Sequence, residues 1–192
     1  MSIPTLPTLI IVSGPMGSGK TTLAHALAPA VGCPAICRDE IKEGMVHATL
    51  PSGTSFVPGP GDELTTRTLP VFFGVLEVLL KAGVTTVAEA AFQDHVWRPR
   101  LVPLLSLAEL RIVHCMVDAD VAFRRALRRA QDDPLRRAHG EDPDDPQLQA
   151  EYRLRIHAHR RISLDAPALE VDTTDGYRPG LDQIVAFVNR QA

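Results

Sequence analysis

The fold is decided by the stretch GPMGSGKT at positions 14–21, which consists of Gly14, Pro15, Met16, Gly17, Ser18, Gly19, Lys20 and Thr21. It matches the pattern G-x-x-x-x-G-K-[ST] at every position. The apolar run Thr8–Ser13 before it predicts a buried strand, and Lys20–Val31 predicts a helix. In this context the glycines let backbone N–H groups wrap a phosphate, while the helix N-terminus adds partial positive charge. The stretch therefore predicts a phosphate-binding loop.

Three side chains complete the predicted nucleotide site. Lys20 is expected to reach the β- and γ-phosphates, and the Thr21 hydroxyl is expected to coordinate Mg²⁺. Thr22, the next residue of the helix, is a further candidate for nucleotide contact. We therefore expect ATP, with GTP as the alternative, together with Mg²⁺. The loop alone does not indicate whether the phosphoryl group goes to water, to a metabolite or to a polymer.

Outward from the loop, apolar runs alternate with helical patterns, which is typical of βαβ units around a parallel sheet. Further strands are expected at Pro34–Cys37, Val84–Ala88, Leu110–Val117 and Ala168–Val171. Further helices are expected at Asp39–Leu50, Glu63–Ala82, Trp97–Ala108, Asp120–Gln131, Gln147–Arg161 and Leu181–Arg190. Three prolines and three glycines make Pro51–Gly61 a predicted surface loop. The predicted fold class is α/β.

The length and composition restrict the class of protein. With 192 residues, the chain is expected to form a single domain. Its 45% hydrophobic and 22% charged residues are typical of a globular protein. A net charge of −3 argues against general coating of nucleic acid. Three cysteines without metal-site spacing, and no apolar run of membrane-spanning length, favour a reducing, cytoplasmic location.

A carboxylate follows the second predicted strand. Asp39 lies in the segment RDEIK, and ligand chemistry in such sheets takes place at the carboxyl ends of the strands. Asp39 can there accept the proton of an attacking hydroxyl, so we predict it to be the general base. Lys42, one helical turn further on, is predicted to contact the acceptor. The alternative is that Asp39 only caps the helix that follows.

Five segments in order resemble the P-loop kinase group, which includes chloramphenicol phosphotransferase, the zeta-toxin sugar-nucleotide kinases, polynucleotide 5′-kinase, and gluconate and shikimate kinases. The segments are GPMGSGKTTLA, RDEIK, VAEAAF, an arginine-rich helix and VDTT. The resemblance implies a five-stranded parallel sheet in the order 2-3-1-4-5, with helices on both faces and a helical lid at about 120–147. It also implies that Asp39 is the base and that Thr173 borders the adenine. Lys42 replaces an arginine of the polynucleotide kinases, which weakens the case for a nucleic-acid phosphate.

Candidate acceptor-binding residues lie in the middle third of the chain. Glu89 ends the third predicted strand and is expected to serve the acceptor or the Mg²⁺, directly or through a water. Asp39 is the other candidate for the metal, and a capping role is the alternative for Glu89. Phe92 and Trp97 are predicted pocket walls. The predicted acceptor contacts are Lys42, Glu89, Gln93, Arg98, Phe56 and Trp97.

Six arginines lie between positions 124 and 137, against two aspartates. Arg124 and Arg128 share one face of the predicted helix, and Arg125 and Arg129 share the next face. One of these side chains is expected to stabilise the transferring phosphoryl group when the lid closes. We predict Arg128 first, as a catalytic and nucleotide-binding residue, followed by Arg124 and Arg136. A solvated helix face is the alternative.

These residues together predict an ATP-dependent phosphotransferase that acts on a hydroxyl of a small molecule, such as a sugar, an antibiotic or a nucleoside-like metabolite. One alternative is a polynucleotide 5′-hydroxyl kinase, which is disfavoured because no basic groove is evident outside the arginine helix. Another is a nucleotide-binding switch or regulatory ATPase that transfers nothing. Neither nucleic acid nor a membrane is an expected partner, and the oligomeric state stays open.

Overall fold

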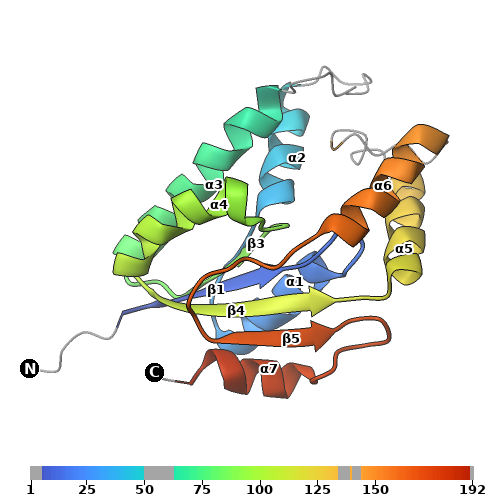
Figure 1. Ribbon diagram of the computed structural model, residues 1–192. Helices are drawn as coiled ribbons and strands as arrows, with labels where there is room; N and C mark the ends of the chain where they lie inside the picture. The colour runs from blue at the N-terminus through green and yellow to red at the C-terminus, as the bar shows by residue number, and fades with distance from the viewer. Residues whose placement is uncertain (1–5, 50–62, 134–138, 140–143, 191–192) are drawn as a thin grey trace, which may run out of the picture.

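The computed structural model describes residues 6–49, 63–133, 139 and 144–190 (Figure 1). Its centre is a five-stranded parallel sheet in the order β2-β3-β1-β4-β5. The strands are β1 (Thr8–Ser13), β2 (Ala35–Cys37), β3 (Thr86–Glu89), β4 (Glu109–Met116) and β5 (Ala168–Asp172). This arrangement confirms the predicted fold class and strand order. The predicted loop Pro51–Gly61, with Phe56, lies outside the described residues.

Helices cover both faces of the sheet. Successive side chains of the central strand point to opposite faces, and those between its two end residues are all apolar, so both faces must be shielded from water. Ile10 and Val12 of β1 face one helical layer, and Leu9 and Ile11 face the other. The layers are α1 (Lys20–Val31) and α7 (Leu181–Val188) on one side, and α3 (Glu63–Lys81), α4 (Asp94–Leu101) and a 3₁₀ helix (Val102–Ser106) on the other. None of the described helices is long and apolar enough to cross a bilayer.

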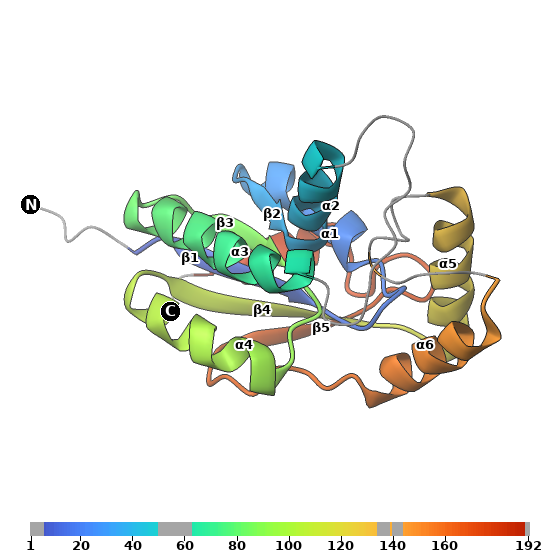
Figure 2. The same cartoon turned by 90° about the horizontal axis from the view of Figure 1, so that it is seen from above.

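Two further helices, α5 (Ala119–Asp132) and α6 (Pro146–Ala158), lie side by side beyond the carboxyl ends of the strands (Figures 1 and 2). They bury a small apolar cluster of their own, separate from the core of the sheet, made of Ala122, Phe123, Tyr152 and Ile156. An aspartate caps the first turn of each helix, Asp118 in α5 and Asp145 in α6. The helix α5 lies within the predicted lid at about 120–147, whereas α6 begins at the end of that range and extends beyond it. Residues 134–138 and 140–143 lie outside the described residues.

The register of the parallel strands brings the predicted site residues together at the carboxyl ends of the strands. Glu89 at the end of β3 pairs with Val12 of β1 and with Cys37 of β2. The helix α2 (Arg38–Thr49) follows β2 directly, so Asp39 lies at the same carboxyl end of the strands as Glu89. The phosphate-binding loop follows β1 at this edge. Parallel pairing therefore gathers residues that are far apart in the sequence.

Two predicted helices differ from those observed by three or more residues at one or both ends, and the others differ by at most two residues at either end. The segment 97–108 is not one helix, because α4 already begins at Asp94 and a 3₁₀ helix follows it. The Asp94 carboxylate accepts a hydrogen bond from the backbone N–H of Ser163 at 2.7 Å, and Pro103 lacks the N–H that a continuing α-helix needs. The helix predicted at 147–161 ends at Ala158.

The aromatic residues of the middle third form part of the core. The sequence predicts Trp97 as an acceptor contact and Phe92 as a pocket wall. Their rings pack on each other at 4.7 Å between centroids and on Phe72 at 5.8 and 6.2 Å, and Trp97 also packs on Phe73 at 5.8 Å. Trp97 is only 7% exposed. The four rings fill the space between α3, α4 and the sheet, where burying large apolar surfaces is most favourable. The structure thus places Trp97 and Phe92 in the core, and neither is among the lining residues of the two cavities beside the phosphate-binding loop.

Candidate active site

The phosphate-binding loop keeps the first turn of α1 open to a ligand. Its N-cap is Gly19, with φ 74°, and no side chain among the described residues caps the helix. Gly17 also has a positive φ of 73°, and a Cβ there would overlap the carbonyl oxygen of Ala122 in α5. Only glycine permits this close approach. The loop backbone therefore lies directly against α5, and the N–H groups at the start of α1 can hold a phosphate.

A buried ion pair lies beside the loop. Lys20 Nζ is 3.7 Å from Glu89 Oε1, and the two side chains are 9% and 1% exposed. Burial raises the pKa of Glu89; Lys20 opposes this effect, and the nearby charge of Asp39 adds to it. The lysine predicted to meet the phosphates is thus held in place by the acid that ends β3.

The same acid fits the predicted metal. Glu89 Oε2 is buried and has no hydrogen-bond partner within the described part of the chain. The Thr21 hydroxyl lies close enough to the Glu89 carboxylate to lower its pKa, against the larger effect of burial, which raises it. A hydroxyl and a carboxylate oxygen are the hard ligands that Mg²⁺ prefers, and Mg²⁺ usually retains several waters. Thr21 and Glu89 therefore fit a Mg²⁺ site next to the phosphates.

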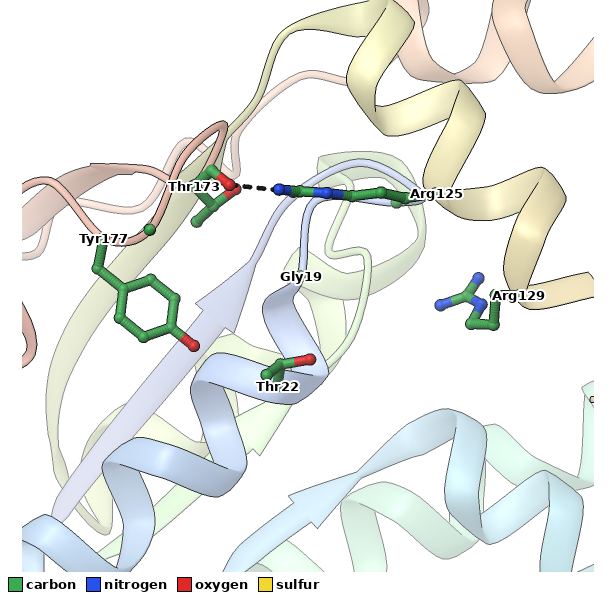
Figure 3. A pocket seen from close by; sticks show the side chains of 8 residues that line it. Gly19, Thr22, Arg125, Arg129, Thr173 and Tyr177 are labelled. Atoms are coloured by element: carbon green, nitrogen blue, oxygen red, sulfur yellow. Dashed lines mark hydrogen bonds between the residues drawn. The ribbon is translucent and has the colours of Figure 1, made fainter. Parts of the chain in front are cut away.

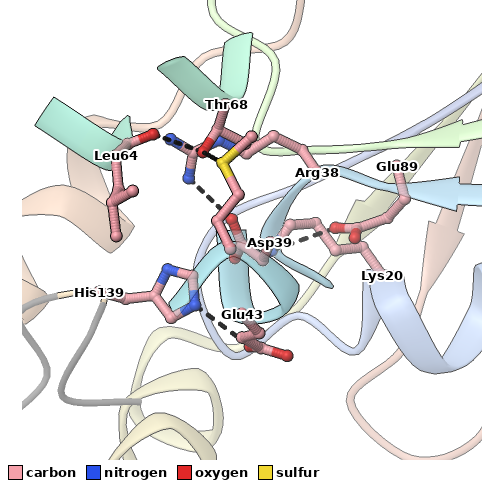
Figure 4. A network of polar contacts seen from close by, with 9 residues as sticks. Lys20, Arg38, Asp39, Glu43, Leu64, Thr68, Glu89 and His139 are labelled. Atoms are coloured by element: carbon pink, nitrogen blue, oxygen red, sulfur yellow. Dashed lines mark hydrogen bonds and ion pairs between the residues drawn. The ribbon is translucent and has the colours of Figure 1, made fainter. Parts of the chain in front are cut away.

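Asp39 lies close to the basic side chains of Lys20, Arg38 and His139 (Figure 4). Arg38 Nη1 donates a hydrogen bond to Asp39 Oδ1 at 2.8 Å, and the Asp39 side chain is 34% exposed. Burial alone would raise the pKa of Asp39, but His139, Lys20 and Arg38 together hold this pKa well below its usual range. His139 itself approaches α2 through Glu43, with Nε2 and Oε1 3.1 Å apart. Asp39 is therefore ionised at neutral pH.

Two cavities open beside the loop. The first cavity, about 340 Å³, lies between α1, α5 and the turn after β5 (Figure 3). It is lined by Gly17, Gly19, Thr22, Arg125, Arg129, Thr173, Gly176 and Tyr177. The second cavity, about 360 Å³, lies on the side of α2. It is lined by Pro15, Met16, Lys20, Arg38, Asp39, Lys42, Ala91, Gln93, Arg129, His139, Arg155 and His159.

Hydrogen bonds fix the wall of the first cavity. The Arg125 guanidinium donates to the carbonyl oxygens of Thr173 and Thr174 at 3.0 and 2.9 Å. The Thr173 hydroxyl lies 2.7 Å from the carbonyl oxygen of Ser18, to which it donates. These contacts tie α5, the end of β5 and the phosphate-binding loop together. Arg125 and Tyr177 present planar groups to the cavity (Figure 3).

Arg129 connects the two cavities, since it contributes to the walls of both. Arg128 does not line either one: its side chain is 84% exposed, and its Nε lies 3.5 Å from Asp132 Oδ2. Arg124 is also exposed. The structure therefore places Arg129, rather than Arg128, at the junction. Arg136 lies outside the described residues.

The other predicted site residues divide into two groups. Lys42 and Gln93 line the second cavity with Asp39, and Lys42 is only 3% exposed. Arg98 is not with them: it is exposed, and its Nη1 donates to Ser163 Oγ at 3.1 Å. The predicted acceptor contact at Arg98 is thus corrected, because α4 turns this side chain toward the segment after α6.

Several residues that line the cavities are not identified by any motif in the sequence. Arg125 and Arg129 are recognised only as the second face of the arginine helix, and Tyr177 carries no motif. The rotation of α5 could have been predicted, because Ala122, Phe123, Ala126 and Ala130 form an apolar stripe. At 100° per residue, Arg128 lies opposite that stripe and Arg129 at its flank. Nothing in the local sequence indicates that His139 and His159 reach the second cavity.

A family model described as an AAA domain matches residues 9–153. The chain belongs to this AAA domain family. The predicted resemblance to the P-loop kinase group is thereby confirmed at the level of family and fold. No curated protein matches the sequence at a significant level.

Solved structures share the fold of this AAA domain. A candidate kinase from Chloroflexus aurantiacus J-10-fl is 24% identical, with a TM-score of 0.82 over 96% of this chain and 97% of that one. The Mycobacterium tuberculosis APS kinase, in complex with AMPPNP and APS, is 15% identical, with a TM-score of 0.60 over 98% and 100%. A gluconokinase from Sinorhizobium meliloti 1021 is 18% identical, with a TM-score of 0.55 over 96% and 90%. At these identities the likeness shows the fold.

A histidine pair lies at the wall of the second cavity of this AAA domain. The rings of His114 in β4 and His159 after α6 stack at 5.5 Å with an interplanar angle of 12°. Burial lowers the pKa of both, and that of His159 to about 4, with His114, Lys20 and Arg160 adding to the effect. Both rings are therefore neutral in the folded protein at neutral pH.

This pair predicts a loss of stability in mild acid. Below about pH 6.5, the pKa of an ordinary histidine, the two rings are protonated in the unfolded chain but stay neutral in the folded protein. The free energy of unfolding therefore falls between about pH 6.5 and pH 4. We expect His159 to contribute about 1–2 kcal/mol, less than its full pKa shift implies, because the ring is partly exposed to screening solvent. Urea unfolding at several pH values measures this. A His159→Gln variant should flatten the profile, and an unchanged profile would contradict the prediction.

Proposed function

We propose that this protein is an ATP-dependent phosphotransferase that moves the γ-phosphate of MgATP to a hydroxyl of a small molecule. The observation that carries the proposal is the pair of cavities joined at Arg129, with Lys20 and Asp39 on the wall of the second. A nucleotide in the first cavity would direct its γ-phosphate to this junction. An acceptor in the second cavity would then meet both the phosphate and a base.

The chain's own residues supply the nucleotide site. The N–H groups of the phosphate-binding loop and Lys20 would hold the phosphates, and Thr21 with Glu89 would hold the metal. Bound Mg²⁺ would neutralise the charge on the phosphate oxygens. The ring of Tyr177 and the guanidinium of Arg125 offer planar surfaces on which a purine can stack. Thr173 would border the base, as the family resemblance implies.

Asp39 would act as the general base. It is ionised at neutral pH and can accept the proton of the acceptor hydroxyl as the oxygen attacks the γ-phosphorus. The bond from the γ-phosphorus to the bridging oxygen breaks, ADP leaves, and the proton passes from Asp39 to solvent. Because the transition state is loose, a weak base in the correct position suffices. Closure of α5 and α6 would complete the site by bringing Arg129 to the transferring group.

The charge of the second cavity favours an acceptor that carries an anionic group. Arg38, Lys42, Arg129 and Arg155 line this cavity with Lys20, whereas Asp39 is the single carboxylate among its lining residues. Part of this charge is compensated, since Arg38 pairs with Asp39 and Arg155 with Glu151, but five cationic side chains against one carboxylate in the lining still favour an anionic group. Charged hydrogen bonds of this kind contribute about 1.5–3 kcal/mol each.

The rival functions differ in what they require. A polynucleotide kinase would need phosphate contacts along a strand and would bind oligonucleotides with a steep salt dependence. A regulatory ATPase would release ADP without any acceptor. The second cavity, about 360 Å³ with Asp39 in its wall, favours transfer to a small molecule over both rivals.

A screen of ADP release tests the proposal. The acceptors would be pairs of alcohols that differ only by one carboxylate or phosphate, together with nucleosides, aminoglycosides, phenicols and a 5′-OH oligonucleotide. We expect acceptor-dependent ADP release, lost in Lys20→Ala, and highest kcat/KM for anionic members. Fast ADP release that no acceptor changes would favour the ATPase rival instead.

Lys42 provides a prediction on acceptor charge. Lys42→Met should lower kcat/KM for an anionic acceptor by about 10- to 100-fold, since it removes one charged hydrogen bond. The neutral partner alcohol should be affected much less. Lys81→Met is the matched control, because Lys81 lies at an exposed position of α3, where it pairs with Glu77. Equal losses for both acceptors would argue that Lys42 has no part in acceptor recognition.

A further inference from the structure

Three side chains with metal-binding atoms meet where β2 ends, between α1 and the first turn of α2, and none of them lines the two cavities. His25 comes from α1, Cys37 ends β2, and Glu40 lies in the first turn of α2. Their ligand atoms all lie within 4.8 Å of one another. Within the described ranges, no other group of three histidine, cysteine or acidic residues meets this condition.

The separations suit a tetrahedral ion. Cys37 Sγ lies 3.7 Å from His25 Nε2, and His25 Nε2 lies 2.6 Å from Glu40 Oε1. Zn²⁺ binds sulfur at ~2.3 Å and imidazole nitrogen at ~2.0 Å, which at tetrahedral angles puts the two ligands ~3.5 Å apart. The observed sulfur–nitrogen separation is close to this value. The short contact between His25 and Glu40 would need to open by less than ~1 Å for an ion to enter.

The thiol distinguishes this group from an ordinary surface ion pair. His25 and Glu40 are 53% and 45% exposed, and such a pair alone would be unremarkable. Beneath them, Cys37 is only 2% exposed. Burial raises the pKa of its thiol, and the carboxylates of Glu89 and Glu40 raise it further. A cation bound here would be attracted by the same carboxylates and would displace the thiol proton.

We propose that His25, Cys37 and Glu40 form a binding site for Zn²⁺ or a similar transition-metal ion, with water as the fourth ligand. One thiolate, one imidazole and one carboxylate are a ligand set that suits Zn²⁺, whereas Mg²⁺ prefers oxygen ligands only. The site is separate from the one at Thr21 and Glu89. An ion there would join α1 to the first turn of α2, one residue away from Asp39.

Titration of the purified protein with Zn²⁺ tests the site. Saturating Mg²⁺ and ADP would first occupy the nucleotide site, so that Zn²⁺ is measured elsewhere. We expect one Zn²⁺ per chain by calorimetry and release of a proton from the thiol. His25→Ala and Cys37→Ser should each weaken binding by at least ~10-fold.

Controls separate this site from adventitious binding. Cys33→Ser removes another thiol and His47→Ala another exposed histidine, and both should bind Zn²⁺ as the unaltered protein does. Co²⁺ should give a thiolate charge-transfer band that Cys33→Ser retains and Cys37→Ser loses. His25→Ala changes an exposed side chain, so the test holds even if Cys37→Ser fails to fold. Binding that is unchanged in His25→Ala, or no binding in the micromolar range, would overturn the proposal.

Discussion

Replacing Asp39 by Asn should lower kcat for phosphoryl transfer by ~10²–10⁴-fold, the contribution typical of a positioned general base. The amide keeps the size of the side chain and can still cap the first turn of α2, but it cannot accept a proton. Affinity for MgATP and background ATP hydrolysis should change only slightly. Steady-state kinetics with the acceptor found in the screen, beside nucleotide binding by calorimetry, measures both quantities.

The matched control is Glu77→Gln, which neutralises a half-exposed carboxylate of α3 that pairs with Lys81. It should leave kcat unchanged. Since the pKa of Asp39 lies below its usual range, kcat/KM of the unaltered enzyme should not fall through protonation of Asp39 between about pH 8 and pH 5. Full transfer activity in Asp39→Asn would leave Asp39 as a helix cap. The base would then be sought at Glu89, whose pKa is raised.

Replacing Arg129 by Ala should lower kcat by ~10³-fold, the lower end of what an arginine contributes when it stabilises a transferring phosphoryl group. Arg129 lines both cavities and, in the proposed mechanism, would reach the transferring group when α5 and α6 close. Because this contact strengthens in the transition state, kcat should fall more than KM rises.

The neighbouring arginine supplies the control. Arg128→Ala, one position earlier on the same helix, removes an 84% exposed side chain whose partner is Asp132. Its kcat should stay close to that of the unaltered protein, and both variants can be checked for equal thermal stability. A large loss in Arg128→Ala with a small one in Arg129→Ala would show that α5 rotates on closure and would return the role to Arg128.

Local sequence determines much of this fold. An apolar strand, a glycine-rich turn and a helix with an uncapped first turn define the phosphate-binding loop without any distant residue. The alternation of apolar runs and helices predicts a parallel sheet, because both faces of each strand need a helical cover. The strand order 2-3-1-4-5 came from the resemblance of the motifs to P-loop kinases, and the structure confirms it.

The composition of the cavities depends on contacts that no local pattern records. Trp97 has the residue type of a pocket wall, but the packing of α3 against α4 buries it. Which arginine faces the nucleotide depends on the rotation of α5, which its apolar stripe sets against α6. His139 and Tyr177 reach the site from segments that carry no motif of their own.

Short-range patterns in the sequence thus predict the phosphate-binding loop, the class of sheet and the candidate base at Asp39. These features depend on residues that are close in the sequence and on which residues follow the carboxyl end of a strand. Three features appear only in the tertiary structure: Arg129 lines both cavities, five cationic side chains line the second cavity, and His25, Cys37 and Glu40 meet. The physical reason is that side-chain neighbours across elements depend on helix rotation and strand register, which the packing of the whole core selects.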